Sequence, residues 1–457
     1  MTPKVDNSET HDLIALTGTP YQVGQQLGSM QRAERDAAWA DKLWTLTQPF
    51  PIAGMTRSTY TSRYIQLLEK WAPHWLPEYQ GLAQALDCPF DDLICLNAVR
   101  YILGPKSSIT GNDDNCTSWI VMPDATAGGT MLLHKNRDGG SSCQGWYLKH
   151  IDGQLKWMGV SDFLSLGTLA GVNVAGVAAV MNNGENCRDV AYSGLSTPDI
   201  LRVILERAHQ ATDAVELCKE IILAGNYAHG NSGSIFMVAD AQRAFILENT
   251  ARHVVAAELY TGFEVRSNDW LLPGMPALAL PATVSRQISD RTRRQRAVEY
   301  LRERIVSHQG ISLRDCRRLS RDRMYADTPA MGVPIANNST TFGVTFALHP
   351  THPDILTSIS LIMGPPLYTP AIPLAFGVTG IPNSLSDSRI IQYAFQARLK
   401  KPYTFDWNKL EEQFENEFKI ALNKAQNILL KSNSSVTNFL DTILINIVSK
   451  VDSKIQA

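Results

Sequence analysis

A cysteine at residue 116 combines a nucleophilic side chain with a position at which the chain could be cut. Residues 112–121 read NDDNCTSWIV, and the alternating pattern of a strand begins at Thr117. Residues 104–115, GPKSSITGNDDN, precede Cys116 and have the Gly, Pro, Ser and Asn content of an exposed loop. A peptide bond at such a junction can be broken without disturbing a core. The Asn115–Cys116 bond is therefore a candidate cleavage site.

Cleavage before Cys116 would turn the residue into both a nucleophile and its own base. The new chain would begin with an α-amino group, whose ordinary pKa of about 7.7 to 8 suits proton transfer at neutral pH. The thiol could make the cut itself, by attacking the Asn115 carbonyl to form a thioester that water hydrolyses. The competing interpretation is that Cys116 is simply a small buried apolar residue.

The stretch DNCTSWIVMPDATAGGTMLLHKNRD starts its first strand at Cys116 and ends its second at the triplet Asn136–Asp138. It resembles the processing site and first hairpin of the linear amide C-N hydrolases. This N-terminal nucleophile (Ntn) group includes acyl-coenzyme A:6-aminopenicillanic acid (isopenicillin N) acyltransferase. Further similar stretches, among them TPYQVGQQLG and LAGVNVAGVAAVMNNGE, extend the resemblance over about residues 14–370.

The resemblance implies an α+β fold, the four-layer αββα sandwich of antiparallel sheets. The sequence pattern agrees, because helical periodicity from Pro20 to about Leu103 gives way to short strands after Cys116. Arginine is absent after Arg398, and amphipathic helical patterns follow it. We expect a helical N-terminal segment at 1–115, a catalytic domain at 116–400 and a helical extension at 401–457. The extension is expected to pack on the body or on a second subunit.

The resemblance also assigns roles to individual residues. Asp138 would return beside Cys116 and orient its new ammonium group, and Asn268 would donate a hydrogen bond to the oxyanion. A second oxyanion position falls on Asn183 or Asn182, with Asn183 favoured. An arginine is also expected near the site. The sequence DRTRRQR leaves four candidates, which are Arg291, Arg293, Arg294 and Arg296.

Composition and missing motifs exclude several other functions. A formal charge of -2 and a pI near 6.6 give no electrostatic reason to expect nucleic acid as a partner. The seven cysteines are odd in number and contain no CxxC pair, so neither a disulfide framework nor a zinc site is expected. No nucleotide-binding or metalloprotease motif occurs, and we predict no cofactor and no metal. Without a signal sequence or a membrane-spanning segment, the predicted location is the cytoplasm.

The sequence leaves several functions open. Hydrolysis of a linear amide, with a small-molecule amide or acyl donor as the substrate, comes first, and acyl transfer from coenzyme A to an amine comes second. A third is an unprocessed thiol hydrolase that uses a histidine, although His134 has no orienting partner in the sequence and is interpreted as structural. A fourth is an inactive scaffold, since Asn115 and Asp269 replace the Gly and His common in the family. The expected partners are the two chains of the processed protein and a second copy of it.

Overall fold

The computed structural model of the protein describes residues 13–32, 56–100, 115–139, 144–308, 310–324, 326–328, 330, 332–386, 389–399, 407–429 and 433–456. The predicted loop ahead of the cleavage site, residues 104–114, lies outside the described residues. Asn115 and Cys116, which flank the predicted cleavage site, lie within the described residues.

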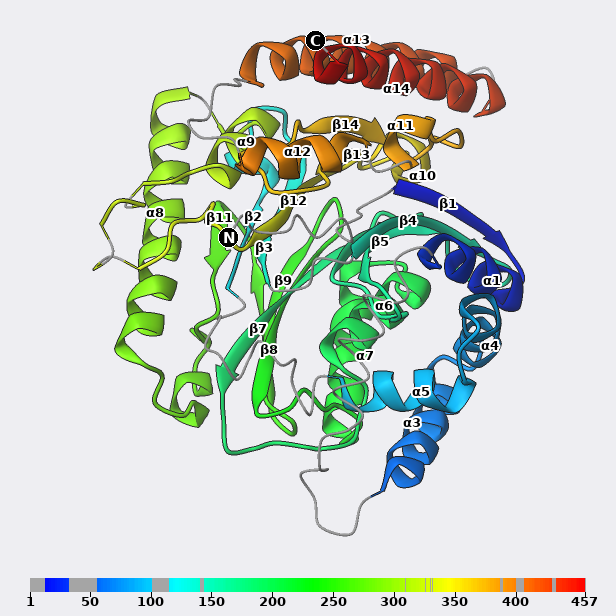
Figure 1. The fold of residues 1–457 in the computed structure, drawn as a ribbon. Helices are drawn as coiled ribbons and strands as arrows, with labels where there is room; N and C mark the ends of the chain where they lie inside the picture. Colours follow the sequence, from blue (N-terminus) through cyan, green and yellow to red (C-terminus); the bar gives the residue numbers. More distant parts are fainter. Residues whose placement is uncertain are drawn as a thin grey trace.

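The strands form two sheets (Figure 1). One sheet has eight strands in the order β1-β4-β5-β6-β7-β8-β9-β10, and the other has six in the order β11-β2-β3-β12-β13-β14. Neighbouring strands pair antiparallel, except that β1 pairs parallel with β4. The strands are β1 (Leu13–Gly18), β2 (Cys116–Val121), β3 (Met131–Asp138), β4 (Gln144–Ile151), β5 (Trp157–Asp162), β6 (Ala170–Asn173), β7 (Ala178–Asn186), β8 (Ser232–Ala239), β9 (Ala244–Asn249), β10 (Val254–Leu259), β11 (Phe263–Arg266), β12 (Thr340–Leu348), β13 (Ser358–Ile362) and β14 (Ile372–Ala375).

Helices cover the outer faces of both sheets. Helices α6 (Thr197–Arg207) and α7 (Ala211–Leu223) pack on the eight-stranded sheet, whereas α8 (Val284–His308) and α9 (Leu313–Ser320) pack on the six-stranded sheet. The sheets face each other where β2 and β3 contact β7 and β8. This arrangement is the predicted four-layer αββα architecture, which is therefore confirmed. The remaining helices are α1 (Pro20–Gln31), α3 (Arg57–Trp71), α4 (Trp75–Leu86), α5 (Phe90–Val99), α10 (Pro353–Leu356), α11 (Asn383–Ser386), α12 (Arg389–Leu399), α13 (Asn408–Leu429) and α14 (Asn433–Gln456).

The N-terminal segment is not wholly helical, contrary to the prediction for residues 1–115. Leu13–Gly18 is a strand, because its alternating buried and exposed side chains suit the edge of a sheet, where it pairs with β4. The helix after it begins as predicted, with Thr19 and Gln22 forming a capping box ahead of Pro20. Helices α1 and α4 pack closely: a Cβ on Gly24 would lie 2.0 Å from the Glu78 carbonyl oxygen.

A buried charge network joins the N-terminal segment to the rest of the protein. Glu78 of α4 accepts hydrogen bonds from Lys149 of β4, at 2.8 Å, and from Arg202 of α6. Arg202 also donates to Glu206, which contacts His74 at 2.9 Å. Breaking one partner of a buried ion pair typically costs about 3–5 kcal/mol, because the other charge is left uncompensated. The contacts between residues before and after position 116 therefore do not depend on the covalent bond there.

The predicted C-terminal extension consists of helices α13 and α14, which pack together against β14 (Figure 1). Their apolar faces are buried; on α13 these include Phe414, Phe418 and Ala425. Glu411 at the start of α13 is fully buried and accepts hydrogen bonds from Arg321 and from the backbone of Ala371. The extension thus packs on the body. Within the described part of the chain, no helix is long and apolar enough to cross a membrane.

Candidate active site

The β2–β3 hairpin places Cys116 beside the triplet that the sequence singled out. Cys116 lies opposite Arg137, and the pairing continues one residue further, where the Asp138 N–H donates to the Asn115 carbonyl oxygen at 2.7 Å. Because side chains alternate along a strand, Cys116 shares one face with Lys135 and Arg137. Asn115 and Asp138 lie on the other face. The candidate cleavage site is therefore part of the hydrogen-bonded sheet.

On the inner face, between the two sheets, the thiol lies in a polar environment. Cys116 is only 5% exposed. Ser118 and Lys135 both bind the Asn182 side-chain oxygen, at 2.8 Å and 3.0 Å. Burial lowers the pKa of Lys135, whereas the charge of an ionised Cys116 and a hydrogen bond to it raise that pKa. The side chain of Lys135 is therefore fully buried and lies beside the thiol.

The polar atoms around the candidate scissile bond all have partners. The Cys116 N–H donates to the Asn268 side-chain oxygen at 2.8 Å. Asn268 in turn uses its side-chain nitrogen to donate to the Asn183 carbonyl oxygen, also at 2.8 Å. The Asp138 N–H thus polarises the Asn115 carbonyl group, and the Asn268 side-chain oxygen holds the Cys116 nitrogen. The nitrogen and the carbonyl group are therefore both held by hydrogen bonds before any reaction.

Arg293 is the one of the four candidate arginines that reaches this bond. Its guanidinium is fully buried and donates to the Cys116 carbonyl, to Thr117 at 2.9 Å and to Asn268 at 3.1 Å. Asp290 balances its charge at 2.6 Å. The other candidates point elsewhere: Arg291 is exposed, Arg294 pairs with Asp269, and Arg296 pairs with Asp322.

The hydrogen bonds also separate the two candidate asparagines. The Asn182 side-chain nitrogen donates to the Ser267 carbonyl at 2.8 Å and to the Arg266 carbonyl at 3.3 Å. Both amide hydrogens of Asn182 are therefore engaged, and this side chain joins the two sheets. Asn183 accepts from His229 at 3.2 Å, and within the described residues its side-chain nitrogen has no hydrogen-bond acceptor. Asn183 therefore stays the favoured candidate for the second oxyanion position.

Asp138 lies on the outer face, next to the backbone of the scissile bond. Its carboxylate accepts hydrogen bonds from Asn337 at 2.5 Å and from Thr340 at 2.6 Å. Burial raises the pKa of Asp138 to about 6, although Arg293 and the two hydrogen bonds act in the opposite direction. An ammonium group formed at Cys116 would add a positive charge beside this carboxylate and lower its pKa.

Two neighbouring residues serve the hairpin rather than the thiol. His134 is on the outer face, stacked on Trp119 at 3.8 Å between ring centroids, and burial lowers its pKa to about 3. It bonds Thr345 at 2.8 Å and Asn136 at 2.9 Å. Asn136 also binds the Ser320 backbone at 2.8 Å. A His134–Cys116 pair is therefore not formed, because the two side chains lie on opposite faces of the hairpin.

Lys135 is the residue of this site that the sequence analysis did not identify. A signal was present, because strand alternation counted back from Arg137 puts Lys135 on the same face as Cys116. Its burial could not be inferred from the sequence, since lysine is normally exposed. The described cysteines are all free, and among the described residues no cluster of three metal-binding side chains occurs.

Comparisons with known proteins give a family and several distant structures. Residues 125–327 match the family model for acyl-coenzyme A:6-aminopenicillanic acid acyl-transferase, which confirms the resemblance predicted from the motifs. The match spans less than half of the chain and begins after Cys116, so it includes Asp138, Asn183 and Asn268 but not the thiol. A search of curated proteins gave no match.

Among solved structures, an N-acylethanolamine-hydrolyzing acid amidase ortholog from Caenorhabditis elegans is 17% identical, with a TM-score of 0.37, and the alignment covers 52% of this chain and 96% of that one. A conjugated bile acid hydrolase mutant from Clostridium perfringens is 13% identical, with a TM-score of 0.36 and coverage of 57% and 91%. Penicillin V acylase from Agrobacterium tumefaciens is 14% identical, with a TM-score of 0.34 and coverage of 57% and 86%. Likenesses this distant carry no argument about the present chain.

Proposed function

Since the chain matches the acyl-coenzyme A:6-aminopenicillanic acid acyltransferase family over residues 125–327, we propose that it is a self-processing cysteine hydrolase of linear amides. The proposal rests above all on the environment of the Asn115–Cys116 bond. A carbonyl that accepts from the Asp138 N–H, a nitrogen held by Asn268 and a thiol beside the buried Lys135 support an intramolecular attack.

Self-processing would proceed by attack of the Cys116 sulfur on the Asn115 carbonyl carbon. The oxyanion that forms keeps the Asp138 N–H as its hydrogen-bond donor. When the C–N bond breaks, the Asn115 acyl group moves to sulfur and the thiol proton passes to the departing nitrogen, which becomes the amino group of Cys116. Water then hydrolyses the thioester, releasing the Asn115 carboxylate and regenerating the thiol.

Turnover would use the same sulfur on an amide substrate. The new amino group of Cys116 takes the thiol proton and passes it to the leaving amine, while Asp138 holds the ammonium form. Asn268 and Asn183 supply side-chain amides for the oxyanion, and Arg293 fixes Asn268 through the bond at 3.1 Å. Water completes hydrolysis by attacking the acyl-enzyme. No metal or cofactor enters these steps.

Acyl transfer is the second candidate, because the matched family model describes an acyltransferase. The two reactions share the acyl-enzyme on Cys116 and differ only in whether water or an amine accepts the acyl group. Supplying an acyl-coenzyme A donor with and without an amine acceptor separates them. N-acyl amine formed in proportion to the added amine would favour transfer, whereas release of the free acid at a rate independent of the amine would favour hydrolysis.

The purified full-length product tests the proposal directly. We expect denaturing electrophoresis and intact-mass measurement to find two chains, 1–115 and 116–457, with the second beginning CTSW. An intact chain that hydrolyses amides would favour the unprocessed thiol hydrolase instead. An intact, inert chain would favour the scaffold, in which the buried groups around Cys116 serve only stability.

Replacing Lys135 should weaken the nucleophile without removing it. In Lys135→Met the sulfur of Cys116 loses its neighbouring buried amino group, so we expect alkylation of Cys116 by iodoacetamide at pH 7 to slow by about tenfold. Lys135→Arg keeps the charge and serves as the matched control. The rate is followed by mass spectrometry of the Cys116 peptide over a range of pH. Identical pH profiles for the Met variant and the parent would rule out this role for Lys135.

Asp138 should make the stability of the uncleaved chain depend on pH. Because its folded pKa of about 6 lies above the ordinary value of 3.8, its stabilising contribution is complete below pH 3.8 and is lost as the pH rises through 6. In a Cys116→Ala background, the free energy of unfolding of the protein with Asp138 should therefore fall by about 2 kcal/mol between pH 4 and pH 7, relative to that of the Asp138→Asn variant. Denaturant titrations at both pH values measure this change. An unchanged difference would show that Asp138 is not a raised, buried acid.

A further inference from the structure

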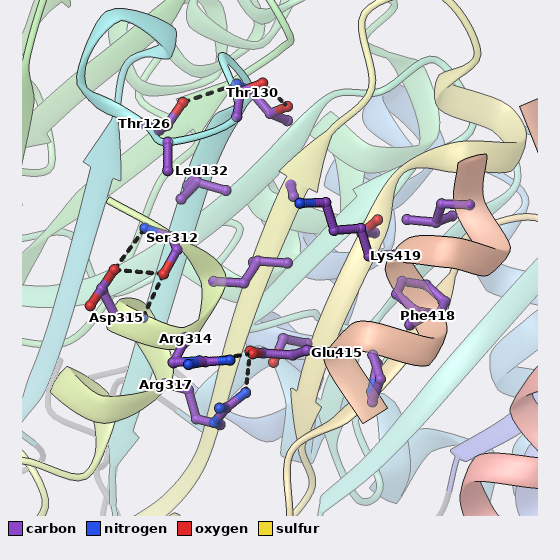
Figure 2. A pocket seen from close by; sticks show the side chains of 18 of the residues that line it. Thr126, Thr130, Leu132, Ser312, Arg314, Asp315, Arg317, Glu415, Phe418 and Lys419 are labelled. Carbon is purple, nitrogen blue, oxygen red and sulfur yellow. Dashed lines mark hydrogen bonds and ion pairs between the residues drawn. The ribbon is translucent and has the colours of Figure 1, made fainter. Parts of the chain in front are cut away.

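A cavity of about 720 Å³ lies far from the chemistry described above, between the outer face of the six-stranded sheet, α9 and α13 (Figure 2). Its apolar lining comes from both sides. Leu132, Ala347 and Pro373 belong to strands β3, β12 and β14, whereas Phe418 and Leu422 belong to the C-terminal helix α13. The C-terminal extension therefore closes over this part of the sheet while leaving a large space beneath it.

The cavity and Cys116 are separate sites. Leu132 lies opposite Val121, at the far end of the β2–β3 hairpin from Cys116, and five residue steps along a strand span about 17 Å. The two also use opposite faces, because Leu132 packs with Trp119 in the outer core, whereas the thiol shares the inner face with Lys135. A ligand in the cavity would therefore not contact the thiol.

The acidic side chains of the cavity are already neutralised. Glu411 binds Arg321 and Arg317, and Glu415 binds Arg314 at 3.2 Å as well as Arg317. Asp315 caps α9, accepting from the Ser312 N–H at 3.0 Å and from the Ser312 hydroxyl at 2.5 Å, as Figure 2 shows. These carboxylates therefore do not prepare the cavity for a cationic ligand.

Among the described residues that line the cavity, Lys419 and Ser360 offer a ligand a cation and a hydroxyl group that are not already paired. Lys419, one turn after Glu415 on α13, extends from its helix across the strands in Figure 2, and within the described residues its ammonium group has no carboxylate partner. The hydroxyl group of Ser360, on β13, lines the same space, and the described part of the chain offers it no hydrogen-bond partner. A free ammonium and a free hydroxyl group above an apolar floor suit a single anionic head group.

We propose that this cavity binds an amphipathic organic anion: an apolar chain that carries one carboxylate. The carboxylate pairs with Lys419 and accepts a hydrogen bond from Ser360, while the chain lies along Leu132, Ala347 and Phe418. The volume falls within the range of about 300–1,000 Å³ typical of small-molecule sites. Binding depends neither on Cys116 nor on cleavage, so this proposal stands or falls separately from the proposed catalytic function.

Titration calorimetry of the full-length Cys116→Ala protein with decanoate tests the proposal. We expect saturable binding of one decanoate per chain, weakened at least tenfold by Lys419→Glu, which reverses the charge. Ser360→Phe, which fills the space, should weaken it as strongly. Lys424→Glu makes the same charge reversal at an exposed position of α13 outside the cavity and should leave the dissociation constant within twofold. Decanol, which has the chain but no charge, should bind at least tenfold more weakly than decanoate.

Several results would overturn the proposal. Absence of saturable decanoate binding to the Cys116→Ala protein would exclude the site. If Lys419→Glu and Lys424→Glu weakened decanoate binding equally, the effect would come from the general surface charge and not from a specific contact with Lys419. Decanol binding as tightly as decanoate would remove the anionic selectivity. Since Ser360→Phe could perturb folding, its circular dichroism and thermal midpoint are compared with the parent, and the exposed Lys419 variant decides the outcome if they differ.

Discussion

Cys116→Ala should leave a single chain of full length and no measurable amide hydrolysis. The substitution removes the group that attacks the Asn115 carbonyl in the proposed mechanism. Because the Cys116 side chain is small and buried, with only 5% exposed, alanine should leave the surrounding packing largely intact. Cys116→Ser keeps a weaker nucleophile and should slow both cleavage and turnover. Intact mass, N-terminal sequencing and release of the free acid from acyl-amino acid and acyl-amine substrates measure these effects.

A second cysteine provides the control for this experiment. Cys88 is half-buried, lies in the N-terminal segment and has no place in the site. Cys88→Ala should be cleaved and should turn over substrate like the parent protein. Cleavage of Cys116→Ala at the parental rate would contradict self-processing by the thiol and would require another agent to cut the chain.

Asn268→Asp should separate cleavage of the chain from turnover of substrate. Aspartate keeps an oxygen that can accept from the Cys116 N–H but loses the amide that would donate to the substrate oxyanion. During processing, the donor to the oxyanion is the Asp138 N–H, which this substitution leaves in place. We therefore expect two chains of normal size but a kcat about 10²–10³ lower, the usual loss for one oxyanion donor.

Asn268→Leu and Asn186→Asp complete this experiment. Leucine removes the acceptor as well as the donor, so processing should slow together with turnover. Asn186 is exposed at the end of β7, and its substitution by aspartate should change neither rate. A fully active Asn268→Asp enzyme would eliminate Asn268 as an oxyanion donor. An uncleaved Asn268→Asp chain would show that this side chain also serves the first reaction.

The expected effects share one structural cause, which is how tightly the scissile bond is surrounded. Arg293 holds the Cys116 carbonyl and Asn268, and Asp290 neutralises Arg293 at 2.6 Å. Because these groups are buried, a lost partner leaves an unsatisfied polar atom that is costly in free energy. The buried network of Glu78, Lys149 and Arg202 would likewise hold the two chains together after cleavage.

Much of this architecture could be predicted from local sequence pattern. Helical and alternating periodicities identified the layered α+β arrangement, and the helical pattern from Pro20 marked a helix start that the structure contains. The motif after Cys116 correctly placed Asp138 beside the candidate cleavage site. The expectation of a helical segment at 1–115 does not include the strand Leu13–Gly18, because six residues carry little periodicity and their pairing with β4 depends on a strand that lies far away in the chain.

By itself, the sequence determined which residues could do chemistry, which elements carry them and which family they resemble. Only the tertiary structure separated neighbours by their contacts. The Asn182 side chain binds the backbone of Arg266 and Ser267, whereas that of Asn183 binds His229. Of the four candidate arginines, Arg293 reaches the Cys116 backbone, and Lys135 lies beside the thiol. The physical reason is that successive side chains on a strand point to opposite faces, so a shift of one residue exchanges one environment for another. Which face meets the thiol is set by how the two sheets pack, and that depends on contacts between residues distant in sequence.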